Sequence, residues 1–313
     1  MNATQLESVR FATAVSPETL RAYENAATAI GRLDAAGVLA PPGLSRLLVL
    51  RASATAHGAS RDGMIALLRP DGEGDKGLRA FHAALLAGAA RARGGVVPSV
   101  ALLHELLQVR RAGDPDAPPV DALLRDARER TPPVLKAVLA ALALLGLSGD
   151  REERSRVAAL AATLVLSVGG ALTDAWVTLP LAREGTLAGP AVAGDAERDA
   201  WLLAAFTALA REARAAERGL AAARERIASD TSRVRDSLGR AAYSALDVLG
   251  LLGAEHILTV PDAARALGQT PPTSSAAVER LVALGIAREV TGRERSRAFV
   301  YVALVDALAP APP

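Results

Sequence analysis

Cysteine is absent from the 313-residue sequence, which excludes disulfide bonds and thiolate metal sites and is typical of the reducing cytoplasm. Aromatic residues are scarce, at 3%, so the core must be built mainly from alanine, leucine and valine, a composition that favours helices. The chain also has no large excess of positive or negative charge, because it contains 36 basic and 34 acidic residues. Any affinity for nucleic acid must therefore come from local clusters of cations.

Apolar runs long enough to cross a membrane are also missing. The two longest, Val134 to Leu147 and Val157 to Leu172, fall short of the roughly 18 residues that a membrane helix needs, so we expect both to be buried helices. The first twenty residues contain acidic side chains and no apolar core, unlike a signal peptide. The chain has no HExxH motif or paired-histidine spacing, so we expect no metal and no cofactor.

Helix signals dominate the first two thirds of the chain. Ser16, Pro17 and Glu18 are typical of a helix start and predict a helix over 16–39. Further helices are predicted over 44–56, from 64 onward, and over 77–92, 99–109 and 121–130. Two apolar helices follow, and we expect the second to pass Gly169 and Gly170 toward Trp176. Residues 179–194, rich in glycine and proline, are predicted to form a loop.

A long helix is predicted from Asp195 to Ser229. Its apolar residues recur in alternating steps of four and three, at Leu202, Phe206, Leu209, Ala213, Ala216, Leu220, Ala223 and Ile227. Such a seam can pack along another helix of the same domain or along a symmetry mate in a homodimer. Alanine at half of the seam positions weakens the dimer alternative.

The stretch from Leu238 to Leu304 predicts a winged helix-turn-helix. It reads as a helix, a short helix over 260–267 stopped by Gly268, a turn, a second helix that Thr273, Ser274 or Ser275 can cap, and two strands over 286–290 and 298–302. A basic loop joins these strands. The fold class is therefore all-α, with a small C-terminal sheet.

Polar residues in this stretch suggest contact with double-stranded DNA. Small polar residues at the exposed start of a second helix fit a major groove, and arginines on a hairpin tip can meet phosphates or a minor groove. The candidate residues are Thr273, Ser274, Ser275 and Arg280 on the helix and Arg293, Arg295 and Arg297 on the loop. The alternative is a small domain for packing, dimerisation or protein binding, with the arginines in a solvated turn.

Short phrases between Arg51 and Val302 resemble the Fic family, the proteins named for filamentation induced by cAMP. GVVPSVALLHELL looks like the helix before that family's substrate-side flap, RDAWLLAAFTALAREA is similar to the helix after its active site, and LGIAREVTGRERSRAFVY looks like its winged-helix ending. The resemblance implies an all-helical domain followed by a C-terminal winged helix. It also implies a motif for AMP transfer, with a histidine base, a magnesium-binding acid and phosphate-cradling glycines.

The chain departs from that motif in its sequence LLGLSGDREERSR. Aligning the last family arginine with Arg156 puts Leu145 at the base position, Leu147 at the phenylalanine position, Gly149 at the acid position, and Asp150 and Glu152 at the glycine positions. Leucine cannot accept a proton, and carboxylates repel phosphate. SATAHG, ending in His57 and Gly58, resembles the family's inhibitory Ser-x-x-x-Glu-Gly stretch, with histidine in place of the glutamate.

The sequence thus predicts an N-terminal helical region over 1–60, a Fic-like helical domain without its catalytic motif over 61–237, a winged helix-turn-helix over 238–305 and a disordered tail over 306–313. The expected function is a cytoplasmic DNA-binding regulator of transcription that is not an enzyme. One alternative is a nucleotide-binding or AMP-transferring enzyme, in which Asp150 and Arg154 or Arg156 are remnants of a phosphate site. Another is a protein-interaction module.

Overall fold

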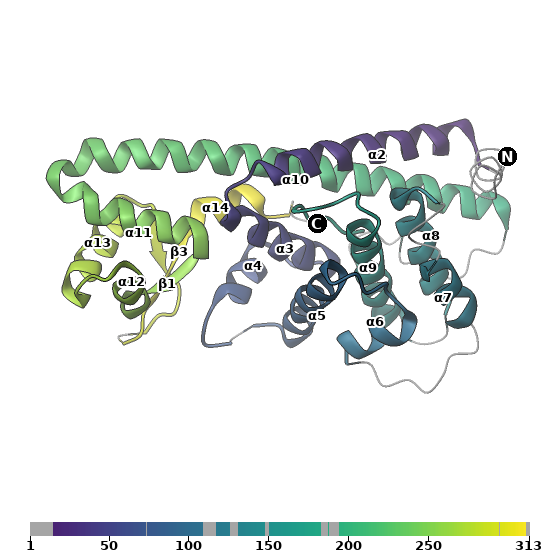
Figure 1. Ribbon diagram of the computed structural model, residues 1–313, viewed down its shortest axis with the longest axis horizontal. Coiled ribbons are helices and arrows are strands. Elements are labelled where there is room, and N and C mark those ends of the chain that lie inside the picture. The colour runs from purple at the N-terminus through teal and green to yellow at the C-terminus, as the bar shows by residue number, and fades with distance from the viewer. Residues whose placement is uncertain are drawn as a thin grey trace.

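One helix spans most of the length of the molecule. The computed structural model describes residues 15–72, 74–108, 117–125, 131–147, 150–182, 187, 194–293 and 295–310, and the described chain is predominantly helical, as the sequence predicts. Helix α10 (Asp195–Leu238) continues past Ser229, the end predicted from the sequence. The first N-terminal helix lies alongside its first half, the other N-terminal helices lie beneath that half, and the C-terminal elements lie beneath its second half (Figure 1).

Helix α2 (Pro17–Val38) lies parallel to the first half of α10. As predicted, the hydroxyl of Ser16 caps it by accepting the amide N–H of Thr19 at 3.2 Å. The predicted seam of α10 is buried from Leu202 to Ala223, and Ile227 is partly buried. Because α2 and other helices of the same chain cover this seam, its packing is intramolecular rather than along a symmetry mate.

The other N-terminal helices lie between α2 and α10 in the sequence, and several of them pack on α9. They are α3 (Pro42–Ala56), α4 (Arg61–Leu68), α5 (Lys76–Arg93), α6 (Val100–Leu106), α7 (Ala117–Arg125), α8 (Pro133–Leu145) and α9 (Arg151–Val168). Helices α8 and α5 pack against α9, whose residues 157–166 are all buried. The predicted helical residues 109 and 126–130 lie outside the described residues. No helix in the described part of the chain has the length and apolarity needed to cross a membrane.

The end of α9 corrects the sequence prediction that this helix continues to Trp176. The helix ends at Val168, with Gly169 as its C-cap and Gly170 in the left-handed region at a φ of 74°. A side chain at Gly169 would come within 2.8 Å of Pro133 at the start of α8. The two glycines therefore end α9 where it crosses α8, and the chain continues as buried irregular structure.

Residues 242–301 form what we call the C-terminal unit. Its elements are α11 (Ala242–Glu255), β1 (Ile257–Thr259), α12 (Val260–Leu267), α13 (Pro271–Ala283), β2 (Ala287–Glu289) and β3 (Ala298–Tyr301). The sheet has the antiparallel order β1-β3-β2, with Leu258 opposite Phe299 and Arg288 opposite Val300. Strand β1 was not predicted, because three residues between two helices are too few for a strand pattern.

The end of the chain corrects the prediction of a disordered tail from residue 306. Helix α14 (Val302–Leu308) returns from the sheet to pack on α10, α3 and α4, and Leu304, Val305 and Leu308 are buried. A side chain at Gly219 of α10 would come within 2.6 Å of the carbonyl oxygen of Ala307, so the two helices are in close contact. Residues 311–313 lie outside the described residues.

Candidate nucleic-acid interface

Helix α13 turns one apolar face inward and leaves a polar face exposed. Ala277, Val278 and Leu281 are buried against α11 and α12. The helix begins at Pro271 and is capped by Thr270, whose hydroxyl accepts the amide N–H of Thr273 at 3.4 Å. The prediction of a cap at residues 273–275 was therefore wrong by one turn, because proline fits the first helical position and the preceding threonine supplies the oxygen.

Three of the four predicted contact residues of α13 reach its outer surface. Thr273 is exposed, while Ser275 and Arg280 are partly exposed, and Arg280 has no ion pair among the described residues. Ser274 is a correction, because it is fully buried and its hydroxyl donates to the side-chain oxygen of Gln269 at 3.3 Å. A pattern of polar residue types could not separate Ser274 from its neighbours, since the inward face of the helix depends on where the helix begins.

A carboxylate also lies on this face. Glu279 is exposed, and its Oε1 accepts a hydrogen bond from the hydroxyl of Ser275 at 3.2 Å. A carboxylate repels phosphate but can accept a hydrogen bond from the amino group of cytosine. The face thus carries groups suited to base edges at its centre.

Glu289 shapes the loop between β2 and β3. Its Oε1 accepts the amide N–H groups of Thr291 at 2.7 Å and of Gly292 at 3.0 Å, and Gly292 is in the left-handed region at a φ of 64°. Partial burial alone would raise the pKa of Glu289, but the hydrogen bonds from Thr291 and Gly292 outweigh it and lower that pKa. The loop is thereby held in one turn by a charged carboxylate.

The three predicted arginines of this loop have different surroundings. Arg295 is exposed and has no ion pair within the described residues. Arg293 approaches Asp71, in the turn after α4, with its Nη2 3.5 Å from Oδ2. Arg297 lies with its guanidinium 5.4 Å from the centre of the Phe299 ring, and its Nη2 is 3.9 Å from Oε1 of Glu279. Arg293 and Arg297 remain 53% and 44% exposed, so the loop is not buried against the helical part.

Arg288 is a cation that sequence reasoning treated only as part of a strand. It lies in β2 between Ala287 and Glu289, and it is exposed without an ion pair among the described residues. With Arg69 and Asp62 it lines a hollow of about 260 Å³ between β2 and α4. The alternation of a strand, with Ala287 buried, would have placed its side chain outward.

A buried carboxylate fastens the C-terminal unit to α10. Asp230 is 1% exposed, and its Oδ2 accepts the hydroxyl of Tyr301 in β3 at 2.7 Å. Arg226 and Arg233 pair with it at 3.0 and 3.1 Å, and Arg233 also donates to the carbonyl oxygen of Leu284 at 2.8 Å. Burial and the bond to Asp230 raise the pKa of Tyr301, so its hydroxyl stays a donor. One network thus positions both β3 and the end of α13.

The residues at the predicted remnant of a catalytic motif hold helix ends together. Leu145 is buried, and its carbonyl oxygen accepts a hydrogen bond from Nη1 of Arg154 at 2.9 Å; that of Leu147 accepts another at 3.0 Å. Asp150 caps α9 by accepting the amide N–H of Glu153 at 3.0 Å. Arg156 is partly exposed on α9, and Gly149 lies outside the described residues. Asp150 and Arg154 are therefore engaged by the main chain.

A second group of polar residues includes a serine beside a histidine. The hydroxyl of Ser53 lies 3.0 Å from Nδ1 of His82 and 2.9 Å from the carbonyl oxygen of Val49. Ser53 is fully buried, so no substrate can reach its hydroxyl. His57, at the end of α3, lies 3.0 Å from the carboxylate of Asp75, which caps α5. This group joins α3 to α5, and no cluster of metal-binding side chains exists among the described residues.

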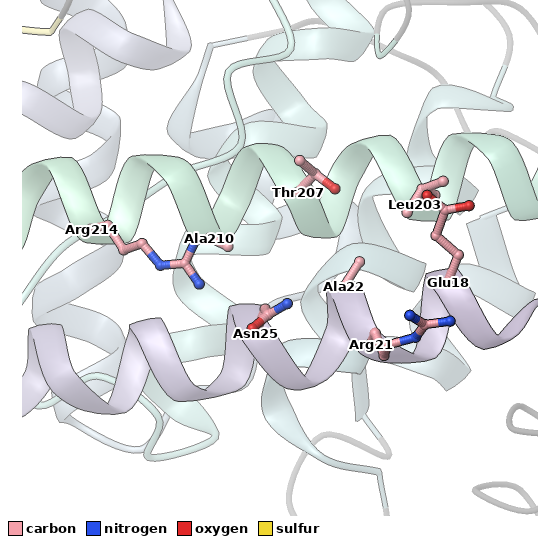
Figure 2. A pocket seen from close by; sticks show the side chains of 8 residues that line it. All are labelled: Glu18, Arg21, Ala22, Asn25, Leu203, Thr207, Ala210 and Arg214. Atoms are coloured by element: carbon pink, nitrogen blue, oxygen red, sulfur yellow. The ribbon is translucent and has the colours of Figure 1, made fainter.

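A separate hollow of about 310 Å³ lies between α2 and α10. Figure 2 shows Arg214 and Asn25 extending from the two helices, with Arg21 and Glu18 nearer the start of α2. Its lining contains no imidazole, no thiol and no pair of carboxylates.

The junction between the C-terminal unit and α3 contains a buried histidine. His256 follows α11 at a φ of 66°, and its Nε2 lies 2.6 Å from the carbonyl oxygen of Gly43. Burial lowers the pKa of His256 to about 4, with a smaller contribution from the charge of Arg46. The folded state therefore favours the neutral ring, whereas the unfolded chain takes up a proton near pH 6.5.

We expect acid to destabilise the protein through His256. Because the pKa is lower in the folded state, its contribution is fully present above pH 6.5 and is lost as the pH falls to about 4, by about 3 kcal/mol in all. Urea unfolding at pH 7 and pH 4.5 should show this loss in the wild type and a smaller one in His256→Asn, since asparagine tolerates the left-handed backbone. An equal loss in both proteins would contradict this assignment.

Comparison with known proteins adds nothing to this geometry. No model of a known protein family matches the chain, and no curated protein matches it at a significant level.

Proposed function

We propose that the C-terminal unit is a winged helix-turn-helix that binds double-stranded DNA, with α13 in the major groove and the β2–β3 loop on the phosphate backbone. Helix α12, the turn at Gly268 and helix α13 supply the helix-turn-helix, and the hairpin beside β1 supplies the wing. The observation that carries the proposal is the unpaired state of Arg280 on α13 and Arg295 on the loop, within the described residues.

The surroundings of each residue assign its role in the complex. Thr273 and Ser275 are small enough to approach base edges, and Glu279 beside them can accept from cytosine. Arg280, Arg288 and Arg295 are free to meet phosphates, which dominate the affinity of such complexes. Arg293 and Arg297 contribute less, because each already has a contact within the chain.

The helical part ahead of this unit acts, in the same proposal, as a Fic-like scaffold without AMP-transfer activity in the cytoplasm. Support comes from Arg154, a candidate remnant of a phosphate site that binds main-chain carbonyl oxygens instead, and from the buried Leu145 at the base position. A homodimer would match two half-sites, and it would use a surface other than the covered seam of α10. Calorimetry with ATP and magnesium distinguishes the enzyme alternative, which requires saturable heat.

Charge reversal tests the DNA proposal. The double variant Arg280→Glu, Arg295→Glu should bind a mixed-sequence duplex at about 50 mM salt at least about tenfold more weakly than the wild type, because two phosphate contacts become repulsions. Fluorescence anisotropy of a labelled duplex measures the affinity.

The matched control is Arg21→Glu, a reversal near the start of α2 at the opposite end of the molecule (Figure 1). It should change the affinity less than about twofold. An equal loss in the control, or a wild type that binds no duplex, would count against the proposal. Capture of a protein partner after nuclease treatment would instead favour the interaction-module alternative.

A further inference from the structure

An apolar groove lies where α10, α11 and the start of α3 meet. Its volume is about 410 Å³, and its walls are mainly apolar. Pocket volumes of roughly 300–1,000 Å³ with mainly apolar walls are typical of sites for small organic molecules. Its lining includes Gly43 at the start of α3, Thr231 and Arg235 of α10, and Gly250 and Gly253 of α11.

Two glycines of α11 widen this groove. Glycine is among the least favourable residues inside a helix, and a glycine there can serve close packing or leave a surface open. Gly43 has a packing reason, since a side chain there would meet the carbonyl oxygen of Gly253 at 2.3 Å. Gly250 and Gly253 have no such packing reason, because no neighbouring atom lies within 4 Å of the position that a Cβ atom would occupy at either residue. The space above them is left open by the chain itself.

One cation lies in this otherwise apolar lining. Arg235 is exposed and has no ion pair among the described residues. Thr231, one turn earlier on α10, donates its hydroxyl to the carbonyl oxygen of Ile227 at 2.7 Å and keeps its lone pairs free as acceptors. A guanidinium beside apolar walls is complementary to a carboxylate that carries a hydrocarbon body.

We propose that this groove binds a small organic anion, a carboxylate with an aliphatic or aromatic body, whose charge pairs with Arg235 and whose body lies over Gly250 and Gly253. The walls of the groove also position the candidate interface, since α10 holds β3 through Asp230 and α11 packs on α13. A bound ligand would therefore change how α13 is positioned relative to α10. This consequence for DNA rests on the proposed function, whereas binding of the ligand does not.

Gly250→Leu tests the groove without removing a contact. Leucine fills the open space and is a good helix former, so the melting temperature should not fall. The full-length wild type should bind the fluorescent anion 1-anilinonaphthalene-8-sulfonate saturably at one site, with displacement by decanoate. Gly250→Leu should weaken this binding at least about tenfold. Gly31→Leu is the matched control, because Gly31 is an exposed helical glycine of α2 that also faces open space.

Arg235→Gln separates the charge from the apolar walls. It should weaken displacement by decanoate several-fold while leaving displacement by the neutral decanol unchanged. Binding that is unsaturable, or that Gly250→Leu and Arg235→Gln leave intact, would overturn the proposal. If these binding results are obtained and the protein binds no duplex, the ligand-binding proposal is supported and only the proposed DNA function fails.

Discussion

Replacing Arg51 with methionine should lower the free energy of unfolding by about 3 kcal/mol, because the buried carboxylate of Glu212 loses its main partner and keeps a longer contact of 3.5 Å with the more exposed Arg211. The guanidinium of Arg51 is 5% exposed and donates to the carboxylate of Glu212 in α10 at 2.7 Å. It also donates to the carbonyl oxygens of Leu308 and Ala309 at 3.0 and 3.1 Å, which end α14. The side chain thus joins α3, α10 and the end of the chain, and urea unfolding measures its contribution.

Two further variants separate charge from packing at Arg51. The double replacement Arg51→Met, Glu212→Met should recover much of the loss, since two apolar side chains replace the pair. Arg46→Ala serves as the exposed control, because Arg46 and its partner Glu255 are 63% and 49% exposed, and such pairs contribute less than about 1 kcal/mol. A loss in Arg51→Met no larger than in Arg46→Ala would contradict the assigned role.

Asp230→Ala should lower the free energy of unfolding by about 2–4 kcal/mol. The change removes the acceptor of the buried Tyr301 hydroxyl and leaves Arg226 and Arg233 without their shared carboxylate. Because Arg233 also reaches Leu284, amide hydrogen exchange at the end of α13 should become faster.

Asp236→Ala is the matched control on the same helix, since Asp236 is exposed and has no ion pair in the described part of the chain. It should change the stability by less than about 0.5 kcal/mol. Tyr301→Phe should reproduce only part of the loss, because it removes one hydrogen bond and keeps the two ion pairs. If Asp230→Ala and Asp236→Ala were equally stable, the network would not fasten the C-terminal unit to α10.

Local signals were sufficient to predict most helices. Ser16 with Pro17 carries cap chemistry that acts within one turn, and Ser16 caps the helix that the structure shows. The apolar seam of α10 could be predicted from its periodicity, but the helix that packs on this seam could not. A period states which face is apolar, whereas the choice between α2 and a symmetry mate depends on tertiary packing.

Features set by distant contacts were missed. Helix α14 depends on Gly219 for close approach and on Arg51 for its last carbonyl oxygens, more than 80 residues away in each case. Strand β1 exists only because β3 lies beside it. Ser274 has the same chemistry as Ser275, and only the start of α13 decides which of the two is buried.

The candidate site was therefore predictable by residue type more than by position. The cluster of arginines after β2 could be seen in the sequence. Which of these arginines form ion pairs within the chain could not. Arg293 has a contact with Asp71 from a turn more than 200 residues earlier, and only Arg295 is left without an ion pair in the described residues. Arg288 was overlooked because a strand pattern was considered for folding alone.

The salt dependence of duplex binding tests the central claim most directly. Each phosphate contact contributes about −0.9 to the slope of log Kobs against log salt concentration, so Arg295→Ala should make the slope shallower by about one, while Arg21→Ala leaves it unchanged. Anisotropy titrations from about 50 to 200 mM salt give these slopes. Identical slopes in all three proteins, or no binding by the wild type at the lowest salt, would contradict a DNA interface built from α13 and its neighbouring loop.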